Sequence, residues 1–276
     1  MATPKVVIVT GANRGIGRAI CQRILTTEPN VSPVKLFAAT RSGQDLGFQS
    51  THATRSVLYP KLDISDHSSV SDFAEEVKQY GSVDVLINNA GVNLDNEYSA
   101  ANARKTMDVN YTSMLDMCQT FIPLLSKRGR IVNLSSIASQ LRFYSPEIQA
   151  RFRDPHATKD TLDDIANDFV KSVEEGNEEA SGFGTPKRSY SVSKALVTAL
   201  TAMLARQHPG VTINCCCPGW VATDMGQLVG SRPPKSPEQG ATIPLRLAFG
   251  DIGDVTGKYW ANDSIRGKGE GEVQEW

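Results

Sequence analysis

The start of the chain, a β-branched run followed at once by a glycine-rich turn, constrains the fold more than any other feature. Residues 5–10 read KVVIVT, residues 11–17 read GANRGIG, and residues 18–25 have apolar side chains at helical spacing. Glycines at such a turn let the backbone bend tightly and approach a pyrophosphate, whose charge meets the N–H groups at a helix N-terminus. The spacing G-x-x-x-G-x-G differs from the common G-x-G-x-x-G fingerprint. The turn therefore predicts a nucleotide-binding strand–turn–helix unit.

The rest of the chain repeats this alternation of strand and helix. Its apolar runs lack the polar–apolar alternation of a half-exposed strand, which favours parallel strands buried on both faces. Strands that alternate with helices indicate a parallel sheet joined by right-handed crossovers. We therefore predict an α/β fold with a doubly wound parallel sheet. The further strands are expected at residues 34–40, 56–63, 83–88, 129–135, 210–217 and 257–261, and the helices at 65–80, 101–125 and 190–207.

A long segment before residue 190 interrupts this alternation of strands and helices. Residues 146–152 and 160–175 have helical periodicity, and the second of these stretches carries apolar side chains on one face and acids opposite them. Residues 174–186, rich in Gly, Glu and Ser, are expected to form a loop. The last ten or so residues contain three glycines and are expected to be loosely ordered.

The length of 276 residues fits neither one average domain nor two. Domains average about 150 residues, but single α/β domains reach about 250. The long segment before residue 190 accounts for the residues beyond the length of one average domain. We predict one domain over residues 1–276 that carries a helical insertion at residues 141–186.

Composition excludes several classes of partner. The chain has 29 Lys and Arg against 30 Asp and Glu, and a net charge of −1 provides no basic face for nucleic acid. No stretch approaches the ~20 apolar residues of a membrane span, and the N-terminus lacks a signal-peptide core and cleavage site. Three of the five cysteines are consecutive and none forms a C-x-x-C pair. We therefore expect reduced thiols, no metal site, no membrane contact and a cytoplasmic protein.

The end of the second strand bears on the choice of nucleotide. An acidic residue there would hold the adenosine ribose, whereas a basic residue suits a 2′-phosphate. The strand at 34–40 ends in Arg41-Ser42, and Arg14 lies in the glycine turn itself. The two arginines favour NADP(H), although Asp45 is close enough in sequence to leave NAD(H) open.

A tyrosine and a lysine four residues apart open the helix expected at 190–207. Tyr190 and Lys194 fall on one helical face because residues four apart are neighbours there. Ser135 ends the fifth strand, and the adjacent Ser136 is an alternative for the same role. The fourth strand ends in the sequence NNAG at 88–91, and the sixth strand ends at Pro218-Gly219. Open α/β sheets bind ligands at these carboxyl ends.

These motifs together make the chain resemble the short-chain dehydrogenases/reductases over essentially its whole length. A closer resemblance is to the monomeric NADPH-dependent carbonyl reductases, carried by CCPGWVATDM at 216–225, by SPEIQ at 145–149 and by the terminal Glu275-Trp276. The resemblance implies a Rossmann-type sheet of about seven strands in the order 3-2-1-4-5-6-7. Ordinary family members separate the serine from the tyrosine by about a dozen residues, so the insertion is a departure from the family pattern.

The resemblance also implies a role for each motif. Tyr190 would donate a proton, Ser135 would donate a hydrogen bond to the carbonyl oxygen, Lys194 would hold the nicotinamide ribose, and Asn110 would hold a water that relays protons. Trp220 and Met225 would line the substrate site with Ser135 and Tyr190, unless Trp220 packs on the insertion instead. The implied cofactor-binding residues are Gly11, Asn13, Arg14, Gly15, Ile16, Gly17, Arg41, Asp63, Ile64, Asn89, Ala90, Gly91, Tyr190, Lys194, Pro218, Gly219, Val221 and Thr223.

The function expected from this resemblance is hydride transfer from NADPH to the carbonyl carbon of a ketone, aldehyde or quinone. The substrate is then a small molecule. An NADP(H)-dependent alcohol or hydroxysteroid dehydrogenase would use the same residues, and a non-catalytic nucleotide-sensing protein is a second alternative. The amphipathic helix at 160–175 could cover the surface through which related subunits usually pair, so we expect a monomer.

Overall fold

The computed structural model describes residues 3–28 and 33–276. Within these residues one sheet has the strand order β3-β2-β1-β4-β5-β6-β7-β8, and every neighbouring pair is parallel except β7 and β8. The predicted doubly wound order 3-2-1-4-5-6-7 is confirmed, with one antiparallel strand added at its edge. The strands are β1 Lys5–Thr10, β2 Val34–Ala39, β3 Arg55–Leu58, β4 Val83–Asn88, β5 Leu125–Leu134, β6 Thr212–Cys216, β7 Tyr259–Ala261 and β8 Glu272–Val273.

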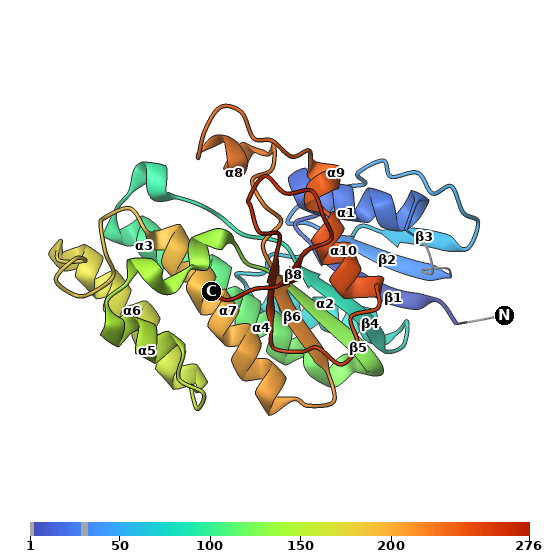
Figure 1. The fold of residues 1–276 in the computed structure, drawn as a ribbon. Helices are drawn as coiled ribbons and strands as arrows, with labels where there is room; N and C mark the ends of the chain where they lie inside the picture. The colour runs from blue at the N-terminus through green and yellow to red at the C-terminus, as the bar shows by residue number, and fades with distance from the viewer. Residues whose placement is uncertain (1–2, 29–32) are drawn as a thin grey trace.

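Helices cover both faces of this sheet (Figure 1). The apolar side chains of β1 alternate between the two faces: Val6 and Ile8 pack toward α2, α4 and α7, whereas Val7 and Val9 pack toward α1 and α10. Five of the six β1 residues are buried, as expected for a strand between two helical layers. The helices are α1 Gly15–Thr26, α2 His67–Lys78, α3 Ala100–Met107, α4 Ser113–Phe121, α5 Pro146–Phe152, α6 Lys159–Glu175, α7 Ser189–Gln207, α8 Asp224–Gln227, α9 Pro237–Gly240 and α10 Thr242–Phe249.

None of the described helices is long and apolar enough to cross a membrane.

The insertion packs outside α7 (Figure 1). Its main helix, α6, buries an apolar face and contacts α3 and α7. Thr158 begins α6 with a capping box, and Gly176 ends it with φ of 66°, a left-handed conformation that glycine adopts without strain. The Tyr111 hydroxyl donates to Asp163 on α6 at 2.8 Å. The loop after α6 is also anchored, because the ring of Phe183 packs edge-on against that of Phe169, with 5.3 Å between the ring centres.

The helical segment predicted at 101–125 is confirmed, but it is not one regular α-helix: α3 and α4 are joined by a π-helical turn, Asp108–Thr112, and a 3-10 turn follows at 122–124. One expectation about the fold is wrong. The last residues, expected to be loosely ordered, include β8, and the ring of Trp276 packs edge-on against Phe152 of α5 at 6.3 Å. Trp276 supplies the apolar area that a glycine-rich tail lacks.

Candidate active site

The first turns of α7 carry the tyrosine and lysine on one face. Lys194 is 4% exposed, and its Nζ donates to the backbone carbonyl of Leu134, at the end of β5, at 2.7 Å. Burial lowers the pKa of Lys194 to about 8 because a charged amine loses its hydration there. Its Nζ lies 5.6 Å from the centre of the Tyr190 ring. The lysine is thus held between the end of β5 and the tyrosine.

The proton affinity of Tyr190 depends first on burial. Burial raises the pKa of this phenol, and a hydrogen bond from Ser136 opposes that rise. A protonated phenol is the form that can donate a proton to a carbonyl oxygen. In a complex with oxidised nicotinamide, the positive charges of the cofactor and of Lys194 would lower the pKa of Tyr190.

The two adjacent serines at the end of β5 point to different partners. Ser135 is 2% exposed, and its hydroxyl binds Thr198 Oγ1 at 2.7 Å and the carbonyl of Lys194 at 3.1 Å, both on α7. Ser136 Oγ accepts from the Ala138 amide at 3.2 Å, and Ser136 is close enough to Tyr190 to lower the pKa of its phenol. In this structure Ser136, and not Ser135, is the serine near the tyrosine, so Ser136 replaces Ser135 as the candidate donor to the substrate.

Asn110 lies on the π-helical turn and is fully buried. Its Oδ1 accepts from the Val92 amide at 2.8 Å, and its Nδ2 donates to the Val92 carbonyl at 2.8 Å and to Ser193 Oγ at 2.9 Å. The side chain therefore fastens the loop after β4 to α7. π-Helical turns inside α-helices are frequent at functional sites. The water-holding role implied by the resemblance stays a proposal.

The three glycines of the turn between β1 and α1 occupy positions where a side chain would be strained or crowded. Gly11 has φ of 67° and Gly15 has φ of 55°, which other residues adopt only with strain. A Cβ on Gly17 would lie 2.4 Å from both the Gly11 carbonyl oxygen and Asn89 Nδ2. Asn89 Nδ2 also donates to the Thr10 carbonyl at 2.8 Å, so the turn is tied to the end of β4. A cradle that a single Cβ would fill suits the close approach of a phosphate group.

The charged residues expected to choose the nucleotide are at the surface. Arg14 pairs with Asp224 of α8 at 2.7 Å, and both side chains are more than 70% exposed. Exposed ion pairs stabilise a fold by only about 0–1 kcal/mol, so Arg14 can exchange this partner for another anion. Hydrogen bonds from Ser65 hold the pKa of Asp63 below its usual range, and the nearby Arg41 lowers it further.

The segment after β6 closes over the glycine turn. A Cβ on Gly15 would lie 3.0 Å from the methyl group of Thr223, which also caps α8. Trp220 donates from its indole to the Gly226 carbonyl at 2.8 Å, and the guanidinium of Arg266 lies over its ring at 5.6 Å. Gly226 lies in the segment after β6 and Arg266 lies in the C-terminal loop, so these two contacts of Trp220 are not with the insertion at 141–186. Met225 is half-buried in α8.

The chain is similar to known proteins in sequence and in fold. The sequence profile of the family described as short chain dehydrogenase matches residues 5–146. The chain is 36% identical over 261 residues to carbonyl reductase [NADPH] 1 of Bos taurus, covering 88% of this chain and 90% of the bovine protein. The chain belongs to the short-chain dehydrogenase family. The human carbonyl reductase [NADPH] 1 is also 36% identical, over 256 residues, with the same coverage of both chains.

The likeness to this family extends to solved structures. Salutaridine reductase from Papaver somniferum superposes with a TM-score of 0.77 at 26% identity, covering 94% of this chain and 99% of that one. Family membership rests on the sequence similarity, and the solved structure shows the same fold.

Sequence reasoning missed one further residue of this short-chain dehydrogenase. Asp95 begins a 3-10 turn after β4, and its carboxylate accepts from the backbone amides of Ser189 and Tyr190. No local sequence pattern predicts this contact, because the hydrogen-bond partners of Asp95 lie far away along the chain. Ser136, by contrast, follows from the alternation of side chains along a strand once α7 is placed on one face of β5. Asn133 and Ser135 share one face of β5 and both bind α7, so the next residue points elsewhere.

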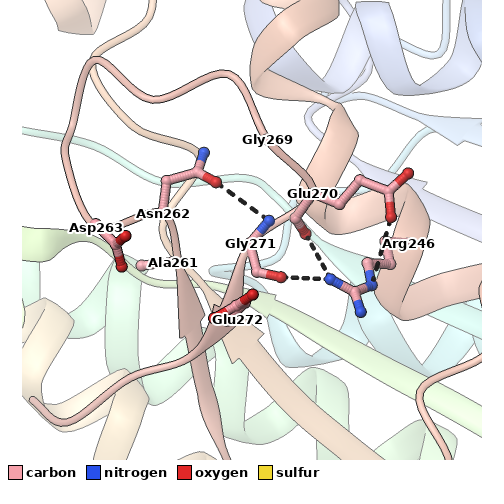
Figure 2. A pocket seen from close by; sticks show the side chains of 8 residues that line it. All are labelled: Arg246, Ala261, Asn262, Asp263, Gly269, Glu270, Gly271 and Glu272. Atoms are coloured by element: carbon pink, nitrogen blue, oxygen red, sulfur yellow. Dashed lines mark hydrogen bonds and ion pairs between the residues drawn. The ribbon is translucent and has the colours of Figure 1, made fainter.

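Figure 2 shows a pocket at the C-terminal segment. Arg246 donates to the backbone carbonyls of Glu270 and Gly271, and Asn262 Oδ1 accepts from the Gly271 amide at 3.2 Å. These groups satisfy one another and fasten the segment to α10. No residue of the predicted site lines this pocket. Its lining residues are Arg246, Ala261, Asn262, Asp263, Gly269, Glu270, Gly271 and Glu272.

A buried lysine beneath the segment after β6 gives a prediction about stability. Lys235 is 1% exposed, and its ammonium has no hydrogen-bond partner within residues 3–28 and 33–276. Burial lowers the pKa of Lys235. Lys235→Met is expected to raise the free energy of unfolding at pH 7 by about 1–3 kcal/mol, the cost of an unsatisfied buried donor. Urea denaturation measures the free energy of unfolding, with the exposed Lys127→Met as a control.

The sign of the pH dependence follows from the lowered pKa of Lys235. Between the folded pKa and the unfolded value the unfolded chain binds more protons, so wild-type stability rises with pH there. The advantage of the methionine variant should therefore shrink as pH rises toward the unfolded pKa of about 10.4. An advantage that grows with pH would contradict this assignment.

Proposed function

We propose that this protein reduces the carbonyl group of ketones, aldehydes or quinones with NADPH. The observation that carries the proposal is the meeting of Tyr190, Ser136 and Lys194 at the carboxyl ends of β5 and β6, beside a glycine cradle between β1 and α1. The relatives named carbonyl reductase [NADPH] 1 support both the reaction and the cofactor.

Each residue of the site has a chemical task in this reaction. NADPH supplies the hydride when bound. The Tyr190 phenol donates a proton to the carbonyl oxygen, and burial keeps that phenol protonated at neutral pH. The Ser136 hydroxyl donates its hydrogen to the carbonyl oxygen of the substrate as negative charge develops there. The oxygen of this hydroxyl already accepts from the Ala138 amide, which leaves the hydrogen free for the substrate. Lys194, positively charged below its pKa of about 8, holds the nicotinamide ribose and stabilises the phenolate.

The cofactor contacts follow the glycine turn. The helix N-terminus of α1 and the turn at Gly11–Gly17 would hold the pyrophosphate, and Arg14 and Arg41 would bind the 2′-phosphate. Asp63 and Ile64 would meet the adenine, whereas residues 89–91 and 218–223 would line the nicotinamide half. Trp220 and Met225 remain proposed walls of the substrate site.

The direct test is NADPH oxidation with a panel of quinones, diketones and aromatic aldehydes. Turnover with at least one class is expected. Turnover of alcohols with NADP⁺ but of no carbonyl compound would favour the dehydrogenase alternative. Binding of NADPH without turnover of any compound would favour the nucleotide-sensing alternative.

The choice between NADPH and NADH gives a prediction about Arg41. Arg41→Ala is expected to raise KM for NADPH about 10–100-fold, the effect of losing a hydrogen bond to a charged group. KM for NADH should stay unchanged because NADH lacks the 2′-phosphate. Steady-state kinetics with both cofactors measure it, with the exposed Arg128→Ala as a control. An equal change for both cofactors would show that Arg41 does not read the 2′-phosphate.

We also propose that the protein is a cytoplasmic monomer. Leu162, Ile165 and Phe169 of α6 are fully buried, so the insertion covers α3 and α7 within one chain. All five cysteines are free, which suits a reducing compartment. Light scattering is expected to give the mass of one chain, 29.9 kDa. A stable dimer or tetramer would contradict the monomer.

A further inference from the structure

The catalytic helix α7 begins without a cap of its own. Its N-cap residue, Arg188, makes no side-chain hydrogen bond to the first turn, and Lys187 before it has φ of 65°. A helix leaves its first amide N–H groups without partners inside the helix, so something else must accept from them. A non-glycine residue in the left-handed region is costly and persists only where surrounding contacts hold it. The entry into α7 is therefore held from outside.

Asp95 provides this external cap. Its Oδ1 accepts from the Ser189 amide at 3.0 Å, and its Oδ2 accepts from the Tyr190 amide at 3.1 Å. Both oxygens of one carboxylate thus bind consecutive amides, and the second amide belongs to the catalytic tyrosine. A carboxylate at a helix N-terminus also interacts favourably with the helix dipole. The residue that caps the helix therefore also holds the backbone of the catalytic tyrosine.

We propose that Asp95 is a positioning residue for the reaction, and that its carboxylate fixes the backbone of Tyr190 and thereby the direction of the phenol. This inference rests on the proposed carbonyl reduction.

The loop that carries Asp95 is tied to α7 at two points. At its start, Asn110 binds both backbone groups of Val92 and donates to Ser193. At its end, Asp95 binds the first turn of α7. Just beyond, the Tyr98 hydroxyl donates to the buried Glu178 of the insertion at 2.7 Å. The loop after β4, which would line the cofactor, therefore cannot move without moving the tyrosine.

Asp95 affects Tyr190 through its charge as well as through its hydrogen bonds. The groups that face Tyr190 are Ser136 at the end of β5, Cys217 after β6, Asp95 from the loop and Lys194 on its own helix. Asp95 and Cys217 raise the pKa of Tyr190, whereas Ser136 lowers it. Loss of the Asp95 charge should consequently lower the pKa of Tyr190.

The same charge reaches two other phenols. Burial is the main cause that raises the pKa values of Tyr98 and Tyr144, and the charge of Asp95 raises both further, whereas Arg188 lowers that of Tyr144. Neither phenol has a role in the proposed proton transfer. The pH profile of the reaction therefore reports the effect on Tyr190.

The test compares Asp95→Asn and Asp95→Glu with Glu97→Gln, which removes an exposed carboxylate from the same 3-10 turn. For Asp95→Asn, kcat for carbonyl reduction is expected to fall about tenfold, equivalent to ~1.4 kcal/mol. Alcohol oxidation with NADP⁺ needs the phenolate, so its rise with pH should move to lower pH in this variant. Asp95→Glu, which keeps the charge, should leave the pH profile in place.

A second measurement does not depend on turnover. Amide hydrogen exchange at Ser189 and Tyr190 is expected to accelerate in Asp95→Asn and to stay unchanged in Glu97→Gln. Faster exchange in Asp95→Asn, combined with a wild type that reduces no carbonyl compound, would support the cap and reject the proposed function. An unchanged kcat and pH profile in Asp95→Asn, or an equal change in Glu97→Gln, would overturn the proposal.

Discussion

Replacing Tyr190 by phenylalanine is expected to lower kcat for carbonyl reduction by about 10²–10⁴-fold, the contribution typical of a general acid. The phenyl ring keeps the packing of the first turn of α7 and removes only the O–H group that donates the proton. Lys194 keeps its hydrogen bond to Leu134, so the affinity for NADPH should change little. Steady-state NADPH oxidation gives kcat, and quenching of protein fluorescence gives the dissociation constant of the cofactor.

The matched control for this variant is Tyr259→Phe. Tyr259 is also a buried tyrosine, but it lies on β7 and not on α7. Removal of its hydroxyl should leave kcat unchanged. Equal activity in Tyr190→Phe and wild type would exclude the phenol as the proton donor, and equal losses in both variants would indicate a general disturbance of the fold.

The core of the fold could be predicted because its signals are local. An apolar run such as residues 83–88 is buried wherever it lies in a parallel sheet, and its ends match β4. The apolar face of residues 160–175 likewise predicts α6 almost to the residue, since helical periodicity needs no knowledge of the partner. The glycine turn is equally local, because its backbone angles and crowding select glycine directly.

The features that could not be predicted depend on contacts between distant segments. The π-helical turn at 108–112 places Asn110 against Val92 and Ser193, and neither partner is visible from helical periodicity. The order of the C-terminal segment depends on Trp276 meeting Phe152 of the insertion. In both cases tertiary contacts override the local preference of the chain.

The serine at the end of β5 lies between these two cases. The sequence leaves Ser135 and Ser136 as alternatives because both follow the strand directly. Side chains alternate along a strand, and the face toward α7 is already occupied by Asn133 and Ser135. Once α7 is placed on that face, Ser136 is the serine left to meet Tyr190 and a substrate. Knowing which face of β5 the catalytic helix covers was the missing information.

Alanine substitutions should separate the two serines by their kinetics. Ser136→Ala is expected to lower kcat by about 10²–10³-fold, the loss typical of one hydrogen-bond donor to a developing oxyanion. Ser135→Ala removes a hydrogen bond to Thr198 and should cost about 0.5–1.5 kcal/mol of folding free energy with kcat nearly unchanged. Thr198 keeps its own hydrogen bond to the Lys194 carbonyl at 3.0 Å, so the catalytic helix stays in place.

Two measurements on both variants make this comparison decisive. Steady-state kinetics at saturating NADPH give kcat, and thermal unfolding gives the change in stability. We expect a large loss of activity with little change in Tm for Ser136→Ala, and the opposite for Ser135→Ala. The reverse pattern would restore Ser135 as the donor. It would also require the end of β5 to turn over on substrate binding, because Ser135 in this structure is buried against α7.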